Sequence, residues 1–261
     1  MRVATRSDLA RAGWTRQEGG RYPAGMKRAE HAAEMLDGPI PLTDLAGCLA
    51  DLARLNAIFG GRFLTVKHIE RLLDGVPRDR TITVLDVGTG GADIPCAVAR
   101  WARRMGRRIR ILAMDRDAAT LAVARRVTAS YPEIALLQGD AQALPVRLGS
   151  IDVVVSALTL HHLEPSAAVP ALAEMDAAAR RGILVNDLMR SRTAYCAVWL
   201  ATRALTRNPI SRHDGPLSVR RAYTAGEVRA LCEKAGLFDV RVYRYPQLAR
   251  QCAVRAKRKR A

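Results

Sequence analysis

The chain has 261 residues, of which 49% are hydrophobic, and it carries a formal net charge of +17. A chain of this kind can bury a full core. No apolar run approaches the ~18 residues that a membrane span requires, and the N-terminus lacks the apolar stretch of a signal peptide, so we expect a soluble, cytoplasmic protein. The five cysteines are far apart and never form a Cys-x-x-Cys pair, which argues against a disulfide framework and a zinc site and predicts no bound metal.

Positive charge is distributed over the whole chain, and only residues 255–260 form a dense basic cluster. A basic surface attracts nucleic acids and acidic lipid headgroups over long range. Arginines scattered among abundant alanines are more typical of a biased composition than of a polyanion-binding surface. We therefore do not expect nucleic acid as a partner, and the sequence leaves room for a homodimer.

The N-terminal part divides into an arm and a helical cap. Residues 1–30 mix arginine, glycine and charged residues without apolar periodicity, which predicts a mobile arm. Residues 31–78 are predicted to form the cap. Its first helix would start with Thr43 as the N-cap and stop at Gly60-Gly61, and its second helix would cover residues 65–73.

Strand and helix patterns alternate from residue 81 onward. Helices are predicted at residues 94–104 and 118–127. Runs of β-branched and apolar residues predict strands at residues 81–87, 109–114, 134–137, 151–157 and 182–187. Because repeated βα units wind a parallel sheet that is covered on both faces, the sequence predicts an α/β fold. We expect a Rossmann-like, doubly wound and mostly parallel seven-stranded sheet.

The segment after the fifth strand is expected to be an insertion. Residues 191–207 have a helical pattern, and residues 208–221, which contain two prolines and a His-Asp-Gly sequence, are predicted to form a polar loop. Residues 190–222 would thus be an insertion or lid within a domain of residues 79–261.

The chain is expected to end in a helix and a hairpin. Thr224 and Glu227 make a capping box for a helix that stops at Gly236. Residues 239–245 and 250–256 would be the two strands of a final antiparallel hairpin.

A glycine-rich turn lies between the first predicted strand and helix, within the sequence Val84-Leu-Asp-Val-Gly-Thr-Gly-Gly-Ala-Asp-Ile-Pro95. Gly88, Thr89 and Gly90 would let the backbone approach a ligand closely, and the following helix adds unpaired amides. A dinucleotide fingerprint would have a third glycine where this chain has Asp93, whose carboxylate would repel a pyrophosphate. Asp86 instead favours a ligand that carries positive charge.

Acidic residues also follow the next two strands. Asp115, followed by Arg116, ends the second strand, where a carboxylate can accept hydrogen bonds from both ribose hydroxyls. Asp140 and Ala141 follow the third strand, where the carboxylate can accept from an adenine amino group. Because parallel strands end at one edge of a sheet, these residues predict a single crevice for a cationic nucleoside. Taken singly, each carboxylate could instead cap a turn or a helix.

In these residues the sequence resembles the class I S-adenosylmethionine-dependent methyltransferases. The likeness covers about residues 60–257 and departs only mildly, with Ala92 where many members have a third glycine. Four motifs carry it, in order: Asp86-Val-Gly-Thr-Gly-Gly, Met114-Asp115, Gly139-Asp-Ala-Gln-Ala-Leu-Pro145 and Asp152-Val-Val-Val-Ser-Ala-Leu-Thr-Leu-His-His162. The resemblance implies S-adenosylmethionine as the cofactor, bound by Asp86, Gly88, Thr89, Gly90, Asp115, Arg116, Asp140, Ala141 and Ser156.

Two later segments, residues 183–190 and 213–224, are similar to small-molecule methyltransferases of the ubiquinone/menaquinone type and to polyketide-tailoring relatives. This likeness implies secondary metabolism and a small-molecule substrate with a phenolic, quinonoid or pyrone-like hydroxyl. It favours O-methylation over C-methylation. Asn56, Arg62 and Tyr223 are further candidates for the wall of the acceptor pocket.

Histidines supply the candidate catalytic base. His161 and His162 lie just past the fourth strand, and a histidine suits the task of accepting the proton of a phenol of pKa about 10. Since adjacent side chains point in different directions, at most one of the two would face the substrate. His213 with Asp214 could form an oriented imidazole over the pocket or an ordinary turn. Arg190 could hold an anionic oxygen of the acceptor or form a salt bridge to a neighbouring loop.

Two other functions fit parts of the sequence. A methyltransferase acting on RNA, DNA or protein would match the net charge. The chain nevertheless has Ser156-Ala-Leu-Thr159 after its fourth strand, where enzymes that methylate adenine amino groups resemble one another in an Asn/Asp-Pro-Pro-aromatic loop. A cofactor-binding partner protein that transfers no methyl group would keep the same carboxylates.

Overall fold

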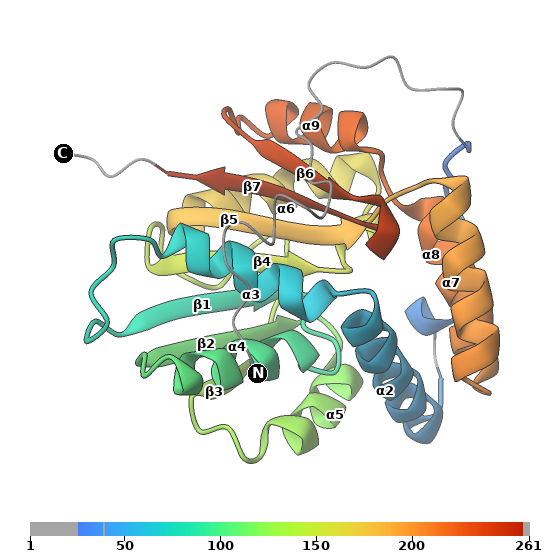
Figure 1. Ribbon diagram of the computed structural model, residues 1–261, viewed down its shortest axis with the longest axis horizontal. Coiled ribbons are helices and arrows are strands. Elements are labelled where there is room, and N and C mark those ends of the chain that lie inside the picture. The colour runs from blue at the N-terminus through green and yellow to red at the C-terminus, as the bar shows by residue number, and fades with distance from the viewer. Residues whose placement is uncertain (1–25, 39, 258–261) are drawn as a thin grey trace.

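A seven-stranded sheet forms the centre of the protein (Figure 1). The structure is a computed structural model and describes residues 26–38 and 40–257, so most of the predicted arm and the end of the basic tail lie outside the described residues. The strands are β1 (Ile82–Val87), β2 (Ile109–Asp115), β3 (Ile134–Gln138), β4 (Ile151–Ala157), β5 (Ala179–Leu188), β6 (Arg241–Tyr245) and β7 (Arg250–Ala256).

The spatial order of the strands is β3-β2-β1-β4-β5-β7-β6. Strands β1 to β5 are parallel, while β7 runs antiparallel to both β5 and β6. This arrangement confirms the expected doubly wound α/β sheet with a final antiparallel hairpin. The chain winds outward from β1 in one direction and from β4 in the other, and in such sheets ligands bind beyond the carboxyl ends of the strands at this switch point.

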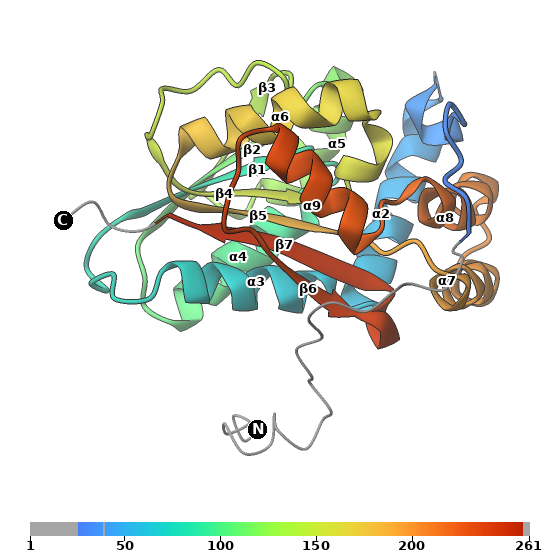
Figure 2. The ribbon, with the colours of Figure 1, turned by 90° about the horizontal axis from the view of Figure 1, so that it is seen from above.

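Helices cover both faces of the sheet. Helices α3 (Gly61–Leu72) and α4 (Asp93–Arg104) lie on one face, and α6 (Pro165–Ala178) and α9 (Ala225–Lys234) lie on the other (Figure 2). Each face has its own apolar core between sheet and helices. The burial of both faces explains why the central strands are nearly continuous runs of apolar residues.

A second group of helices gathers at the end of the sheet where the parallel strands finish (Figure 1). It consists of the short helix η1 (Met35–Asp37), α2 (Leu42–Ile58), α7 (Arg192–Leu205) and α8 (Pro209–Arg221). Helix α5 (Ala118–Thr128) packs against β2, β3 and α2. Helix α2 reaches the glycine-rich loop, since the side chain of Leu49 lies beside Gly91. These helices therefore cover the edge where the predicted ligand residues lie.

Two boundaries of the N-terminal helices differ from the prediction. Helix α2 starts at Leu42 with Pro41 in the N-cap position, so Thr43 lies inside the helix and is not its cap. Helix α3 starts at Gly61 instead of residue 65. Gly60 alone makes the turn, because its φ of +68° is a conformation that glycine adopts without strain.

The predicted polar loop at residues 208–221 is wrong, because this segment forms helix α8. Asn208 caps the helix by accepting a hydrogen bond from the amide of Ile210 (2.9 Å), and Pro209 occupies the first turn, where its missing amide costs nothing. Pro216 lies within the helix, which packs against α7 through buried residues such as Val219. Tertiary packing here overrides the local signals for a loop.

The C-terminal expectations are confirmed. Thr224 and Glu227 form both hydrogen bonds of a capping box at the start of α9. Strands β6 and β7 pair as the expected hairpin. Strand β5 is longer than predicted at both ends, because Ala179 pairs with β4 and Leu188 pairs with β7.

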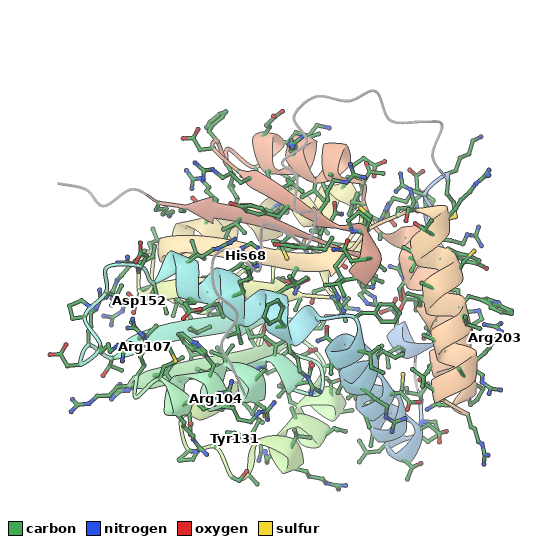
Figure 3. All side chains as sticks on the ribbon, in the orientation of Figure 1. His68, Arg104, Arg107, Tyr131, Asp152 and Arg203 are labelled. Atoms are coloured by element: carbon green, nitrogen blue, oxygen red, sulfur yellow. The ribbon has the colours of Figure 1, made fainter. Side chains whose placement is uncertain are left out.

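Among the residues that the structure describes, exposed basic side chains occur on separate parts of the surface. Arg104 on α4 and Arg203 on α7 are both exposed and lie on well-separated parts of the molecule (Figure 3).

Among residues 26–38 and 40–257, no helix is both long and apolar enough to cross a membrane.

The two threonines of the predicted caps provide a test of the helix boundaries. We expect Thr224→Ala to lower the free energy of unfolding by about 1 kcal/mol, because it removes an N-cap hydrogen bond. Thr43→Ala, at an exposed position inside α2, should be neutral or slightly stabilising, because alanine is the better helix former. Urea denaturation of both variants measures the difference, and an equal loss in both would contradict the observed cap positions.

Candidate active site

The loop after β1 is held in a compact turn by its neighbours. The amides of Gly88 and Thr89 both donate to the carbonyl of Met114, at 2.9 and 2.8 Å. Gly88 has a φ of +73°, and a Cβ atom there would lie 2.4 Å from the hydroxyl of Thr159. Only glycine fits this position, so the loop can pass directly over the ends of β1 and β4.

Asp86 lies at the end of β1 beneath this loop and is almost fully buried. Its Oδ2 accepts a hydrogen bond from the Thr89 hydroxyl (2.7 Å), whereas its Oδ1 has no hydrogen-bond partner within the described part of the chain. Burial, reinforced by the charges of Asp93 and Asp115, raises the pKa of Asp86 to about 7. A buried carboxylate oxygen without a donor fits a ligand that brings a cationic donor.

Asp115 lies beside the loop at the end of the adjacent strand β2. Its Oδ2 accepts from the amide of Gly90 (2.9 Å) and its Oδ1 from the amide of Asp117 (3.1 Å). Each carboxylate oxygen has further acceptor capacity, so the group can still take hydrogen bonds from a diol. The structure thus brings Asp86, the glycine loop and Asp115 together.

The remaining predicted cofactor residues lie around this crevice in different roles. Asp140 is exposed after β3 and accepts from the amide of Gln142 (2.8 Å). Ala141 and Ser156 line the same small cavity beneath the loop, and the Ser156 hydroxyl donates to the carbonyl of Val87 (3.1 Å). Arg116 is exposed, and its carbonyl oxygen accepts a hydrogen bond from the side chain of Gln138.

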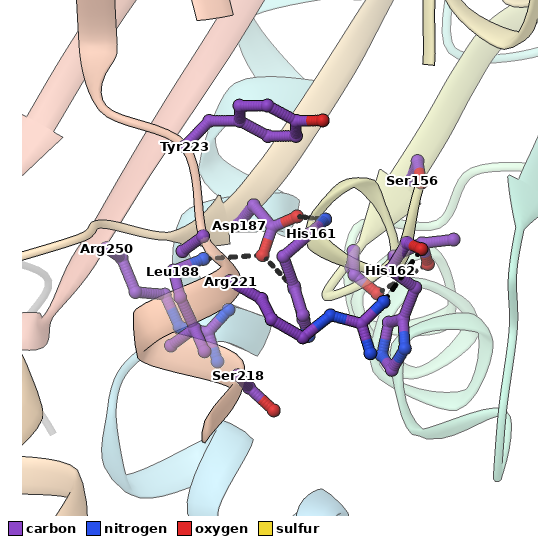
Figure 4. Close-up of polar contacts among 12 residues, drawn as sticks. Ser156, His161, His162, Asp187, Leu188, Ser218, Arg221, Tyr223 and Arg250 are labelled. Atoms are coloured by element: carbon purple, nitrogen blue, oxygen red, sulfur yellow. Dashed lines mark hydrogen bonds and ion pairs between the residues drawn. The ribbon is translucent and has the colours of Figure 1, made fainter. Parts of the chain in front are cut away.

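His161 is positioned by a buried carboxylate where β4 and β5 end. It lies on the short helix η2 (Leu160–His162), directly after β4, and its Nδ1 is 2.6 Å from Oδ1 of Asp187 at the end of β5 (Figure 4). The other oxygen of Asp187 accepts from the amide of His161 (3.0 Å). Burial opposes the charge of Asp187, but the imidazole and these hydrogen bonds hold the pKa of its carboxyl below the usual value. Nε2 of His161 faces the buried carboxylate of Glu34, 3.8 Å from its Oε1.

His162 stacks beside His161, with ring centroids 4.3 Å apart. Its Nδ1 lies 3.1 Å from Asp37, and its backbone carbonyl accepts from Arg221, which also pairs with Asp37. Figure 4 shows the two imidazoles and Arg221 in one group. Contrary to the expectation that adjacent histidines diverge, both rings lie in the same cluster.

Glu34 is a member of this cluster that the sequence did not reveal. It precedes η1, is buried, and accepts a hydrogen bond from Ser218 (3.0 Å). Its carboxylate oxygens lie 3.8 and 3.9 Å from the Nε2 atoms of His161 and His162. The segment around Glu34 has no periodicity or motif that predicts its place in the site. Only the histidine pair could have indicated such a residue, because buried imidazoles are stabilised by a nearby carboxylate.

His213, Asp214 and Arg190 have other contacts. His213 is half-exposed on α8, and its Nδ1 lies 2.7 Å from Asp214. Asp214 also accepts the amides of Met35 and Leu36, both at 2.9 Å, and thereby fixes η1 on α8. Arg190 binds the carbonyls of Met26 and Ala222 and the carboxylate of Glu227. In this structure these side chains hold the N-terminal segment and the cap in place.

Asn56 and Arg62 connect the cap to the start of α4. Both donate to the same oxygen of Asp93, at 2.8 and 2.9 Å. The buried Arg250 donates in turn to the side-chain oxygen of Asn56 (2.6 Å). Tyr223 is buried against the guanidinium of Arg28 and donates to the carbonyl of Leu163.

Comparison with known proteins agrees with this geometry. Residues 84–182 match a family model described as a methyltransferase domain. Among curated proteins, a 2-phytyl-1,4-naphtoquinone methyltransferase of Thermosynechococcus vestitus is 44% identical over 63 residues, which are 24% of this chain and 27% of that protein. A malonyl-[acyl-carrier protein] O-methyltransferase of Xylella fastidiosa is 32% identical over 100 residues, 38% of this chain and 31% of that protein. The chain thus spans about a third or less of these relatives.

Solved structures show the same fold. A putative S-adenosylmethionine-dependent methyltransferase from Methanococcus maripaludis superposes with a TM-score of 0.58 at 14% identity, covering 86% of this chain and 97% of the other. A SAM-dependent methyltransferase from Aquifex aeolicus gives a TM-score of 0.50 at 19% identity, covering 77% and 94%. Residues 84–182 thus match a methyltransferase domain, and the fold is that of S-adenosylmethionine-dependent methyltransferases, which implies S-adenosylmethionine as the cofactor.

Asp86 provides a pH test of the cofactor site. Because its pKa in the cofactor-free protein is about 7, the carboxylate becomes charged as the pH rises from about 6 to about 8, and only the charged form attracts the cofactor's ammonium. We expect cofactor affinity to increase over this range. Asp86→Asn should remove most of the increase and weaken binding at pH 8 by roughly 10–100-fold. Calorimetric titrations at several pH values measure the cofactor affinity of each protein. Asp140→Asn, which changes an exposed carboxylate, is the control and should keep the pH dependence.

Asp115→Ala tests the predicted ribose contacts. The substitution should cost roughly 1.5–3 kcal/mol of cofactor-binding free energy, because a charged acceptor of two hydroxyls is lost. Binding measured for S-adenosylmethionine and for a ribose-deoxygenated analogue separates this effect from a disturbed loop. The analogue should bind the variant and the parent protein with similar affinity, and unchanged affinity for the full cofactor would refute the assignment.

Proposed function

We propose that this chain transfers a methyl group from S-adenosylmethionine to a small-molecule acceptor, at a phenolic, quinonoid or pyrone-like hydroxyl. One juxtaposition carries the proposal. Asp86, with its free buried oxygen, and the His161–Asp187 pair stand at the ends of β1, β4 and β5, which are neighbours in the sheet. A site for a cationic cofactor therefore adjoins a group that can take a proton.

The reaction requires positioning more than elaborate chemistry. Bound S-adenosylmethionine would supply a methyl group on a sulfonium sulfur. The acceptor would attack the methyl carbon in line with the carbon–sulfur bond, and the neutral thioether would be the leaving group. Asp187 fixes the imidazole of His161 through Nδ1, so Nε2 is available to accept the proton of the acceptor hydroxyl. Helices α2 and α8 cover this edge of the sheet, and the exclusion of water strengthens the electrostatic interactions beneath them.

The named relatives support a small-molecule acceptor. One is named for a phytylated naphthoquinone and the other is named as an O-methyltransferase of malonyl-acyl carrier protein. The histidine beside the crevice favours oxygen as the nucleophile, because a hydroxyl must lose a proton for the transfer. A place in secondary metabolism and cytoplasmic action belong to the same proposal.

Transfer of labelled methyl groups tests the proposal against its alternatives. Purified protein is incubated with labelled S-adenosylmethionine and with fractionated small molecules, RNA or protein from a cell extract. We expect label in a small-molecule fraction. Label in RNA or protein would show that the acceptor is a macromolecule instead of a small molecule. Cofactor binding without any labelled acceptor would support a non-catalytic partner protein.

Asp187 offers a kinetic prediction. Asp187→Asn should lower kcat by roughly 10²–10⁴-fold, because the imidazole loses the carboxylate that orients it and stabilises its protonated form. Cofactor affinity should remain unchanged, since Asp187 faces the acceptor side. Asp152→Asn is a matched control, because Asp152 is equally buried but lies at the opposite end of β4, where it binds Arg80 and the amide of Thr83. A similar loss of kcat in both variants would indicate a general folding defect instead.

A further inference from the structure

We propose that Glu34, His161 and His162 form a binding site for one divalent transition-metal ion, with Zn²⁺ the best match. Each residue offers one ligand atom, and the three atoms lie within 4.8 Å of one another. The residues come from two short segments, the one that ends in η1 and the helix η2 after β4. The fold thus brings together ligands that are more than 120 positions apart in the sequence.

The distances suit a single ion. Oε1 of Glu34 lies 3.8 Å from Nε2 of His161, and Oε2 lies 3.9 Å from Nε2 of His162. Two atoms that each bind one ion at about 2.1 Å cannot be more than about 4.2 Å apart. Each carboxylate–imidazole pair meets this limit through a different oxygen of Glu34. With one ligand atom from each residue, the three atoms lie within 4.8 Å of one another, so the side chains must move inward by a fraction of an ångström to bind one ion.

Both imidazoles are oriented as metal ligands are. The Nδ1 of His161 is held by Asp187 at 2.6 Å and the Nδ1 of His162 by Asp37 at 3.1 Å. An Nδ1–H that donates to a carboxylate leaves the lone pair on Nε2, and both Nε2 atoms face Glu34. Carboxylate–histidine–metal arrangements of this type fix the tautomer and raise the basicity of the ligand nitrogen.

The polar neighbours of Glu34 provide a hydrogen bond to only one of its carboxylate oxygens, because Ser218 donates to Oε2. The side chain of Glu34 is 2% exposed, and no hydrogen bond within the described chain reaches Oε1. The guanidinium of Arg221 is 3.6 Å away but is directed to Asp37 at 2.9 Å and to the carbonyl of His162. A buried carboxylate oxygen with no donor is costly, and a cation between Glu34 and the imidazoles would satisfy it.

The formal charge of the cluster also suits a divalent cation. Glu34, Asp37 and Asp187 contribute three negative charges and Arg221 one positive charge, so with neutral imidazoles the net charge is −2. One M²⁺ ion balances it. Two nitrogens and one carboxylate favour zinc or a similar transition metal over Mg²⁺ and Ca²⁺, which prefer oxygen ligands.

Three protein ligands leave a coordination position open, and the side chain of His162 is 24% exposed. This consequence rests on the proposed function: an acceptor hydroxyl bound to the ion would lose its proton to solvent water more readily, and the resulting oxyanion would take the methyl group. His161 would then act as a ligand, and the metal would replace it as the activator of the hydroxyl. Metal binding itself does not depend on that function.

Metal titration of the full chain tests the site. After treatment with EDTA and removal of the chelator, the protein is titrated calorimetrically with Zn²⁺ and Mg²⁺, and with Co²⁺ by visible absorption. We expect one Zn²⁺ per chain, no Mg²⁺ binding, and Co²⁺ bands typical of four or five ligands. Glu34→Gln and His162→Gln should each weaken Zn²⁺ binding by about 100-fold or more, and Asp187→Asn by about 10–100-fold.

His213→Ala is the matched control, because His213 also pairs with an aspartate but lies outside the cluster; its Zn²⁺ affinity should equal that of the parent chain. Circular dichroism and S-adenosylmethionine binding show whether each variant is folded. The proposal is overturned if folded Glu34→Gln and His162→Gln bind Zn²⁺ as tightly as the parent, or if the parent binds Mg²⁺ equally well. Zn²⁺ binding without methyl transfer would refute only the proposed function, and methyl transfer without a Zn²⁺ site would refute only the metal.

Discussion

The contact between His161 and Asp187 connects the parts of the protein on which the site depends. Asp187 lies near the end of β5, and His161 lies in η2, which follows β4. Their hydrogen bonds therefore fix the segment that follows β4 against the end of β5. Both groups are buried, and an unpaired carboxylate in that position would be strongly unfavourable. The pair therefore holds η2 in place, and η2 in turn sets the position of both imidazoles relative to the glycine loop.

The cap contributes the other half of the site. Asp214 and Arg221 on α8 hold the segment with Glu34 and Asp37 against the histidines. Asp214, a candidate for catalysis from the sequence, thus binds the segment that follows Glu34. The packing of α7 against α8 supports this arrangement.

Electrostatics divides the crevice into two regions. Around the loop after β1, burial and then the charges of Asp93 and Asp115 keep the pKa of Asp86 high, and a cationic cofactor would stabilise its charged form. Around η2, carboxylates, imidazoles and a guanidinium alternate. The two regions meet at the ends of β1 and β4, where the loop touches Thr159. Under the proposed function, the methyl donor and the acceptor would meet at this contact.

The sequence by itself determined the sheet, the glycine loop and the carboxylates at the strand ends. These features depend on local order: strand ends of a parallel sheet meet at one edge whatever surrounds them, so Asp86 and Asp115 could be placed from spacing alone. Only the tertiary structure decided that residues 209–221 are a helix, because burial against α7 outweighs two prolines and a His-Asp-Gly sequence. It also decided that Glu34 joins His161 and His162, since contacts between segments so far apart leave no periodicity in the chain.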